Sequence, residues 1–438
     1  MAMQTRRDFL ISAGAVAAVS ALGITDKAVA STELAFKPED DAELNVLRWT
    51  QFVPAEEKRW MANTKKFTEL TGIKVQMDRA SFEDIRPKAA VAARVGSGPD
   101  IILGWFDDPH RYPGKLMDVS DVANNLAQKY GDWYDVCKTY GMNGKQWIGI
   151  PIAVIGNEMV YRKSHVQAAG FEEFPQDFPG FLKLCQALHA KGTPPGFPLG
   201  HSVLDGNGWI YWMLWGHGGK VVDEKGNVVL DSPETVAALE YVKELYKTFA
   251  PGTLSWQDPS NNTAFFDNKV SLINNGISVY FSALNSKDAA RHALADDIFH
   301  SHLPVGPIGK PAELQGLTQM MLFNYTKYPN AAKAYMQFMM EAEQYNPWLE
   351  DSLGYVGQTL KAYEKNPIWT SNPKITVYRD VASRMLPDGY AGPLGTASAA
   401  VMADYVVIDM FALAASGSKS PKDAAAEAAE RAKRFYKS

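Results

Sequence analysis

Apolar and polar residues recur with two different periods in the stretch that follows residue 43. Residues 44–49 and 73–77 alternate as strands do, and 100–103 form a short apolar run typical of a buried strand. Residues 55–70 and 82–95 carry apolar side chains at helical spacing, and the first of these stretches ends before Gly72, a typical helix stop. This β-α-β-α-β order with short connections predicts an α/β fold, with a largely parallel sheet covered by helices.

The rest of the chain continues the mixture of strands and helices. We expect strands at 146–151, 158–161, 270–274 and 300–304, and helices at 178–191, 209–215, 233–249 and 421–436. No internal repeat or long linker separates independent units in the sequence. Two intertwined lobes are therefore favoured over separate domains in a row.

Residues 1–30 have the features of an export signal. A twin arginine precedes an apolar run at 10–24, and Ala28 and Ala30 offer small side chains for a cleavage site. Together these features are typical of a twin-arginine (Tat) signal peptide cleaved after Ala30. The apolar run is shorter than the ~20 residues that a membrane-spanning helix needs, although an N-terminal anchor is the alternative. We expect an exported, soluble protein of the periplasm.

Composition and charge narrow the classes of function. The chain has 438 residues and a net charge of −5, which makes nucleic acid an unlikely partner. Its two cysteines, Cys137 and Cys185, are too few for a disulfide framework or a cysteine zinc cluster, and the sequence does not decide whether they pair. No haem, iron–sulfur or dinucleotide motif is present, and His300 and His302 are better explained as residues of a strand than as a metal pair. We expect no cofactor and no metal.

Motifs of catalysis are also missing from the sequence, while features of binding are present. Asp107 and Asp108 follow a predicted strand, at the sheet edge where α/β proteins gather their ligands. Adjacent carboxylates point in different directions, whereas glycoside hydrolysis needs two carboxyl groups ~5–9.5 Å apart from separate elements. These residues therefore indicate binding more than catalysis, and we expect no enzyme.

A tryptophan-rich segment at 208–219 offers a further binding feature. Trp209, Trp212 and Trp215 share one face of the predicted helix, and core packing explains two of the three. Trp209 opens the helix beside Asn207, which suits the apolar face and the hydroxyls of a sugar. We expect Trp209 and Asn207 to contact a ligand.

Several segments, in their order and spacing, resemble the maltose-binding-protein-like family of extracellular solute-binding proteins, the sugar-binding components of ABC importers. The matching segments are FTELTGIKV at 67–75, GPDII at 98–102, NGK at 143–145, IPIAV at 150–154, YRK at 161–163, AFF at 264–266, NG at 275–276 and AASG at 414–417.

The resemblance implies a periplasmic-binding-protein type II fold, in which two α/β lobes are joined by crossover strands around a ligand cleft. Residues 31–153 plus 302–324 would form lobe one, and residues 154–301 plus 325–438 lobe two. The protein would be a monomer that closes on a carbohydrate and delivers it unchanged to the permease subunits of an ABC transporter.

The resemblance also implies ligand-binding residues, position by position. The implied residues are Gln51, Phe52, Trp105, Asp107, Asp108, Asn157, Asn207, Trp209, Gly276, Ser278, Tyr355 and Gly357. The family often has a stacking Trp after Asn275-Gly276, where this chain has Ile277, and maltose binders place an acid where this chain has Ile155. These departures favour a small oligosaccharide, a modified sugar or a polyol over a maltodextrin.

Two alternatives stay open. The same fold would bind a sulfonated or phosphorylated sugar if Arg79 or Arg111 reached the cleft, or a polyamine if Asp107 and Asp108 did. An exported glycoside-processing enzyme using Asp107 or Glu158 is the other, less favoured alternative.

Overall fold

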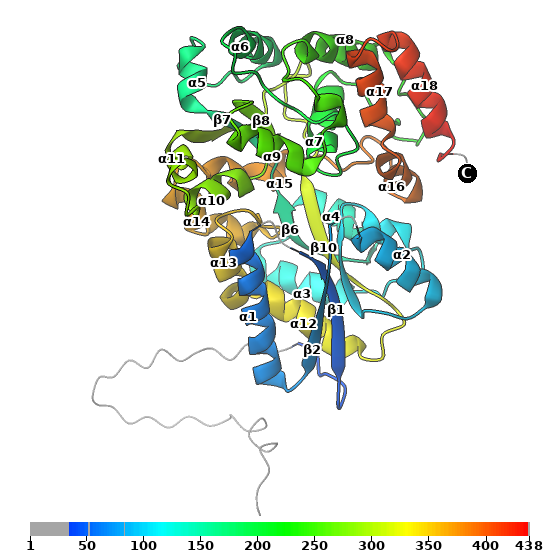
Figure 1. Cartoon of the computed structure of the whole chain (residues 1–438). Coiled ribbons are helices and arrows are strands. Elements are labelled where there is room, and N and C mark those ends of the chain that lie inside the picture. The colour runs from blue at the N-terminus through cyan, green and yellow to red at the C-terminus, as the bar shows by residue number, and fades with distance from the viewer. Residues whose placement is uncertain (1–34, 51–52, 83, 437–438) are drawn as a thin grey trace, which may run out of the picture. The chain divides into compact units, whose positions relative to one another are not determined.

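The computed structural model describes residues 35–50, 53–82 and 84–436. The expected signal peptide, residues 1–30, lies outside this part of the chain. A five-stranded sheet in the order β2-β1-β3-β10-β6 forms the centre of the first lobe (Figure 1). Its strands are β1 (Glu43–Trp49), β2 (Lys74–Ala80), β3 (Ile101–Trp105), β6 (Ile150–Ile155) and β10 (Gly316–Leu322). A two-stranded ribbon, β4 (Met142–Asn143) and β5 (Gln146–Trp147), accompanies it.

The first sheet is parallel among β1, β2 and β3, as the sequence predicted, and antiparallel at β10, where the chain comes back from the second lobe. β1 pairs in parallel with β2 and β3, and Val46 is opposite both Met77 and Ile101. β10 inserts between β3 and β6 and runs antiparallel to both. Every residue of β3, β6 and β10 is buried, because helices cover the sheet.

Helices from both ends of the chain cover this sheet. α1 begins with Pro54 and ends at Gly72, whose left-handed conformation (φ 78°) suits a glycine stop. α13 packs on α1, and α12 packs on α1 and α3 (Figure 1). The helices of the first lobe are α1 (Pro54–Thr71), α2 (Ile85–Val95), α3 (Ser120–Tyr130), α4 (Asp135–Gly141), α12 (Pro329–Met340) and α13 (Ala342–Asp351), with the 3-10 turns η2 (Asp108–Arg111) and η4 (Lys361–Lys365).

The second lobe is built on a three-stranded antiparallel sheet in the order β8-β7-β9. Its strands are β7 (Glu158–Arg162), β8 (Leu272–Asn275) and β9 (Ile298–Ser301). Its helices are α5 (Lys163–Ala168), α6 (Phe178–Ala190), α7 (Asp205–Gly216), α8 (Pro233–Tyr246), α9 (Asp258–Phe266), α10 (Ser278–Leu284), α11 (Ala289–Asp297), α16 (Thr396–Ala403), α17 (Val406–Ala415) and α18 (Pro421–Lys433), with the 3-10 turn η3 (Thr253–Ser255). α7 lies at its centre and is buried along its whole length (Figure 1).

The chain passes between the lobes several times. β6 leads directly into β7, and residues 302–315 connect β9 to β10. After η4 the chain turns toward the second lobe through α14 (Ile368–Ser371), and η5 (Thr376–Asp380) and α15 (Val381–Arg384) follow. Residues 376–388 then run along the boundary, because Met385 bridges to Glu313 and the Asp388 N–H donates to the Tyr140 hydroxyl at 2.8 Å.

The expected lobe boundaries differ from this architecture at one point. Residues 325–438 were assigned as a whole to the second lobe, but α12 and α13 pack on helices of the first. The pattern of apolar residues makes both helices amphipathic without saying which lobe their apolar faces cover.

One stretch, Thr396–Ala415, is long and apolar enough to cross a membrane by composition alone. Tyr405 has a left-handed backbone (φ 53°) and separates the stretch into α16 and α17. α17 packs on α7, α8 and α18, so it is a core helix of the second lobe.

Candidate functional site

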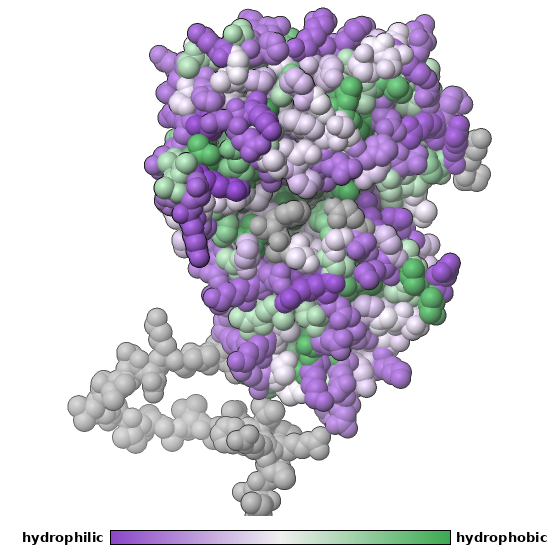
Figure 2. All heavy atoms as spheres, in the orientation of Figure 1, coloured by the Kyte–Doolittle hydropathy of each residue, from purple (hydrophilic) through white to green (hydrophobic). Residues whose placement is uncertain are grey.

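A cavity of about 410 Å³ lies between the two lobes, at the point where β6 passes into β7. This volume is in the range of small-molecule sites. Figure 2 shows a largely hydrophilic face that is hollowed between the lobes. The described lining residues are Thr50, Ser81, Phe82, Ile155, Asn157, Leu204, Asp205, Asp258, Pro259, Asn262, Asn275, Gly276, Ser278 and Tyr355.

Asp258, the first residue of α9, closes the N-terminus of α7. Its carboxylate accepts the backbone N–H groups of Val203, Leu204 and Asp205 at 2.8–3.1 Å. It also accepts the Ser202 hydroxyl at 2.7 Å. A helix N-terminus ordinarily attracts anions through such N–H groups. Here a carboxylate of the protein already occupies them.

Asp205 joins three elements on the second-lobe wall of the cavity. Its Oδ1 accepts the Asn157 side-chain amide at 3.1 Å, and its Oδ2 accepts those of Asn261 and Asn275 at 2.9 and 3.0 Å. Burial, together with the charge of Asp258, raises the Asp205 pKa well above its usual range, and the amide donors oppose that rise. The three amides are thereby held with their nitrogens toward Asp205.

This orientation leaves oxygen atoms for a solute. Asn157 Oδ1 has no hydrogen-bond partner among the described residues. The side-chain oxygen Oδ1 of Asn275 receives only a long contact of 3.5 Å from the Ser278 hydroxyl. The Tyr355 hydroxyl likewise makes no hydrogen bond within the described chain, and burial raises its pKa far above the usual phenol value. Tyr355 therefore presents a neutral hydroxyl to the cavity. Phe82 adds an aromatic ring from the first lobe.

Four of the residues expected to bind ligand line this cavity: Asn157, Gly276, Ser278 and Tyr355. Gln51 and Phe52 lie outside the described residues, directly after Thr50, which does line it. The other expected residues lie elsewhere.

Trp209 lies in the core of the second lobe rather than at the cavity. Its side chain is fully buried, its ring packs on Phe197 and Phe249, and its Nε1–H donates to the Pro198 carbonyl at 2.6 Å. Asn207 is also buried and donates to the Val203 carbonyl at 3.0 Å. Trp209 was expected to open the helix and contact a ligand. Because α7 begins at Asp205, Trp209 is instead in the second turn of the helix, inside the lobe.

Trp105, Asp107 and Asp108 lie at the first lobe's boundary and are not among the described residues that line the 410 Å³ cavity. The Trp105 ring packs between Trp49 and Phe82, with centroids 4.4 and 4.0 Å away. Asp108 accepts Arg86 Nε–H and the Trp105 backbone N–H, both at 2.8 Å. Asp108 therefore has structural partners, and Trp105 borders a neighbouring cavity of about 320 Å³ with Arg86 and Arg111, which shares Phe82 with the first cavity.

Asp107 belongs to a buried carboxyl pair between the lobes. Its Oδ2 accepts the Ser398 hydroxyl of α16 at 2.9 Å. Burial raises the Asp107 pKa to about 6, Arg86 opposes that rise, and the neighbouring Asp388 carboxyl has a raised pKa for the same reason of burial. The two carboxyl groups are enclosed at the boundary between the lobes, and neither is among the described residues that line the cavity.

Gly357 is a backbone partner of the first lobe. Its N–H donates to the Val154 carbonyl at 2.7 Å, and a Cβ at this position would meet the Val154 side chain at 2.8 Å. Gly357 thus allows its segment to approach β6 closely rather than to contact a ligand.

Other expectations concern cysteines and histidines. Cys137 and Cys185 are both buried free thiols. His300 contacts the Lys374 carbonyl through Nδ1 at 2.6 Å, and His302 lies beside Glu158. No group of three or more metal-ligating side chains occurs in the part of the chain that the structure describes.

Sequence reasoning placed Asp205 only beside Trp209 and missed Asp258, Asn262 and Asn275 as members of the site. The available signal was the density of asparagine at 261–262 and 274–275, directly at a helix and at a strand end.

The chain matches a family model described as bacterial extracellular solute-binding protein over residues 62–377. It is 22% identical over 337 residues to the putative ABC transporter periplasmic-binding protein YcjN of Escherichia coli K12, a match that covers 73% of each chain. Among solved structures it resembles maltose-bound MalE3 of T. maritima, at 18% identity and a TM-score of 0.77, over 90% of this chain and 100% of the other.

It also resembles an ABC transporter solute-binding protein of Agrobacterium radiobacter K84 in complex with ribitol. That match has 18% identity and a TM-score of 0.73, over 91% of this chain and 100% of the other. At these identities the two structural matches bear on the fold, and they confirm the two-lobed α/β architecture implied by the resemblance.

Proposed function

The chain belongs to the family of bacterial extracellular solute-binding proteins, and from this premise we propose that it captures an uncharged, hydroxyl-rich solute and delivers it to an ABC permease. The solute is a small oligosaccharide, a modified sugar or a polyol. The lobes close on it, and it is released unchanged.

The cavity between the lobes is the observation that carries this proposal. Thr50, Ser81 and Phe82 come from the first lobe, while Asp205, Asp258 and Asn275 come from the second. A solute that touches both walls binds the closed arrangement more tightly than an open one and shifts the population toward it. Binding and closure are then one event.

The charges around the cavity support a neutral solute over an anionic one. The described lining contains two aspartates and no Lys, Arg or His, and the residues at 51, 52 and 83 add no positive charge in the sequence. An anion such as a sugar phosphate would meet no cation in this lining. Each of these carboxyl groups already accepts three or more hydrogen bonds from the protein, so neither is left free to pair with the ammonium groups of a polyamine.

The polar atoms that face the cavity suit a polyol or sugar. Asn157 Oδ1 can accept a hydrogen bond from a solute, whereas the hydroxyls of Ser81, Ser278 and Tyr355 can both donate and accept one. Phe82 supplies an apolar surface for the C–H face of a sugar. The bound solutes named for the structural neighbours, maltose and ribitol, are of this kind.

We propose export to the periplasm through the Tat pathway, with cleavage after Ala30. The twin arginine, the apolar run and the small residues at the cleavage position support this route. A periplasmic location also fits the family, whose members act outside the cytoplasmic membrane.

A thermal-shift screen tests the proposal. Matched sets of a neutral sugar, its sugar acid and its amino sugar are compared with polyols and polyamines. A solute at a hundredfold over its Kd stabilises the folded state by ~2.7 kcal/mol, a shift of a few degrees in Tm for a chain of this size. We expect a neutral member to respond and the acid of the same set to stay silent.

Two glycine variants show whether the response comes from this cavity. Gly276→Phe places a ring in the cavity, where a Cβ meets only the Gly156 carbonyl at 3.3 Å and Asn157 at 3.8 Å. Gly395→Phe is the control, because a Cβ there meets nothing within 4 Å. The shift is expected to disappear in the first variant and to persist in the second. A response confined to sugar acids, or one that survives in Gly276→Phe, contradicts the proposal.

A further inference from the structure

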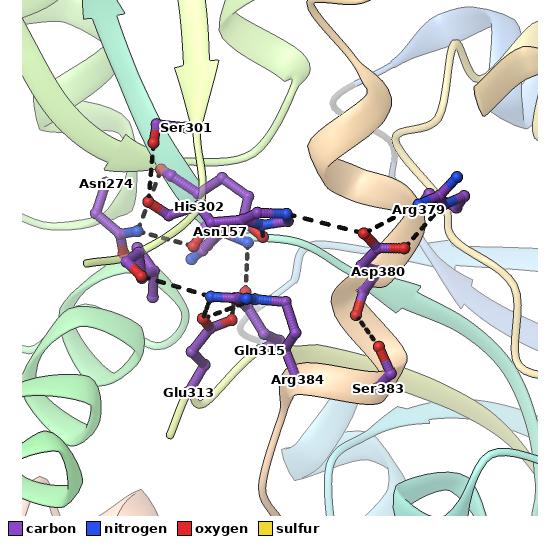
Figure 3. Close-up of polar contacts among 12 residues, drawn as sticks. Asn157, Asn274, Ser301, His302, Glu313, Gln315, Arg379, Asp380, Ser383 and Arg384 are labelled. Atoms are coloured by element: carbon purple, nitrogen blue, oxygen red, sulfur yellow. Dashed lines mark hydrogen bonds and ion pairs between the residues drawn. The ribbon is translucent and has the colours of Figure 1, made fainter. Parts of the chain in front are cut away.

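The connections between the lobes bring acidic and basic side chains to one buried place. Glu158 follows the β6–β7 passage, His302 follows β9, and Glu313 lies just before β10. Asp380 ends η5, and Arg384 ends α15 on the segment along the boundary. We call these five residues the hinge cluster, and Figure 3 labels four of them, His302, Glu313, Asp380 and Arg384.

Glu158 is the member with the weakest partners. Its side chain is fully buried, and no hydrogen bond of ordinary length and angle reaches either carboxylate oxygen from the described residues, with only the Leu303 backbone N–H close enough to oppose the rise in its pKa. The nearest basic atom, His302 Nδ1, lies 3.5 Å from Oε1, and the other ring nitrogen of His302 lies 3.9 Å from Asp380 Oδ2. The surroundings of Glu158 therefore favour the neutral carboxyl over the ionised carboxylate.

The remaining members are already paired. Glu313 accepts Arg384 Nε–H and Nη2–H at 3.0 and 2.6 Å, and it accepts the Gln315 amide at 3.1 Å. Arg384 is thus committed to Glu313, and Figure 3 shows the two side chains pointing toward each other. Ionised Glu158 would add an uncompensated negative charge to the cluster.

The hinge cluster is also linked to the cavity. The Asn157 backbone N–H donates to Gln315 Oε1 at 2.5 Å, and the Asn274 amide donates to the backbone carbonyls of Asn157 and Glu158 (Figure 3). Asn157 lines the cavity, and Glu158 follows it directly. Changes at Glu158 therefore bear on the wall that contacts a solute.

We propose that the hinge cluster is a proton-controlled hinge: protonated Glu158 favours the packed arrangement of the lobes, and its ionisation favours a separated arrangement in which water reaches the carboxylate. The inference rests on the proposed closure of the lobes around a solute. It adds that protons set the balance between the two arrangements before any solute binds.

The charges facing Glu158 give the direction of the effect. They are Arg384 from α15, Asp380 and the Tyr378 hydroxyl from η5, His302 after β9 and Glu313 before β10. Burial raises the Glu158 pKa to about 8, with Arg384 opposing, and raises the Glu313 pKa to about 7. Burial lowers the His302 pKa, so this ring supplies no positive charge at neutral pH.

A group whose pKa is raised in the packed arrangement binds its proton more tightly there. Rising pH therefore disfavours that arrangement between the ordinary glutamate value of 4.5 and about 8. In this window one proton changes the ratio of separated to packed molecules by up to about tenfold per pH unit. Below and above the window Glu158 has no further effect.

Small-angle X-ray scattering of the solute-free protein at pH 5.5 and 8.5 tests the proposal. The wild-type radius of gyration is expected to be larger at pH 8.5. In Glu158→Gln, which keeps the shape and cannot ionise, this difference is expected to shrink or vanish. Glu69→Gln on α1, whose side chain is 63% exposed, is the matched control and should follow the wild type. The Asp107 and Asp388 pair also titrates between the lobes, so the difference between the wild-type and Glu158→Gln profiles isolates Glu158.

A second measurement needs no variant. Hydrogen exchange at 154–162 and 300–316, corrected for the intrinsic effect of pH, is expected to be faster at pH 8.5 in the wild type. Equal wild-type radii and equal corrected exchange at both pH values overturn the proposal, as does a Glu158→Gln profile identical to wild type. If a solute reduces the radius of gyration by the same amount at both pH values, the proposed solute-binding function is supported and the proton-controlled hinge is contradicted.

Discussion

Replacement of Asp205 by alanine removes the residue that joins three elements of the cavity wall. The side-chain amides of Asn157, Asn261 and Asn275 each lose a hydrogen bond of 2.9–3.1 Å, although Asn261 keeps the Asn274 carbonyl and Asn275 keeps two other acceptors. Asn261 is fully buried, so the N–H that loses its acceptor there costs ~1–3 kcal/mol, whereas Asn157 borders the cavity and Asn275 keeps two acceptors, so each of these costs less. The variant also avoids burying a carboxyl group, which offsets part of the loss. We expect unfolding free energy to fall by about 2–4 kcal/mol.

Urea unfolding followed by tryptophan fluorescence measures this change, with Asp177→Ala as the matched control. Asp177 is an exposed N-cap of α6 that accepts a single N–H, from Gly180 at 2.7 Å, so its loss should cost ~1 kcal/mol. Solute affinity is expected to fall at least tenfold in Asp205→Ala and to stay unchanged in Asp177→Ala. A loss of stability below about 0.5 kcal/mol, or undiminished affinity, would refute the view that Asp205 orients the amides.

Three further variants test other parts of the structure. Asp388→Asn should flatten the pH dependence of stability. The raised Asp107 pKa of about 6 makes the folded state bind more protons than the unfolded state above the ordinary 3.8, so the stability that the pair contributes to the wild type falls as pH rises from about 4 to 6. Urea midpoints at pH 4.5 and 7.5 that differ by the same amount in variant and wild type would contradict this. Trp209→Phe should lose ~1 kcal/mol of stability with its hydrogen bond to Pro198 and keep solute affinity, and weakened binding without destabilisation would show that Trp209 contacts solute after all. Tyr355→Phe should keep the Tm and lose about tenfold in affinity by calorimetry, and unchanged affinity would remove the Tyr355 hydroxyl from the site.

The local elements of the fold could be predicted because they depend on local patterns. Alternation at 44–49 and helical spacing at 55–70 correspond to β1 and α1 within one or two residues. The start of α7 could not be placed in the same way. Two glycines at 206 and 208 favour a loop, and the helix begins at Asp205 because Asp258, more than fifty residues away, caps it.

The site was partly predictable for a related reason. Asn157, Gly276 and Ser278 follow a crossover or a strand end, where polar residues meet a cleft, and all three line the cavity. Trp209 carries the same chemistry as a stacking residue. Its burial is decided by Phe197 and Phe249, which the chain brings to it from other elements, and no spacing within 205–216 reveals that.

A crystal structure with the solute found in the thermal-shift screen would show whether the cavity between the lobes binds it. We expect an intact, uncharged solute in the cavity, within hydrogen-bond distance of Asn157 and the Tyr355 hydroxyl and touching Phe82 from the first lobe. A solute bound instead beside Trp105 and Arg111, or one recovered chemically altered, would contradict this expectation.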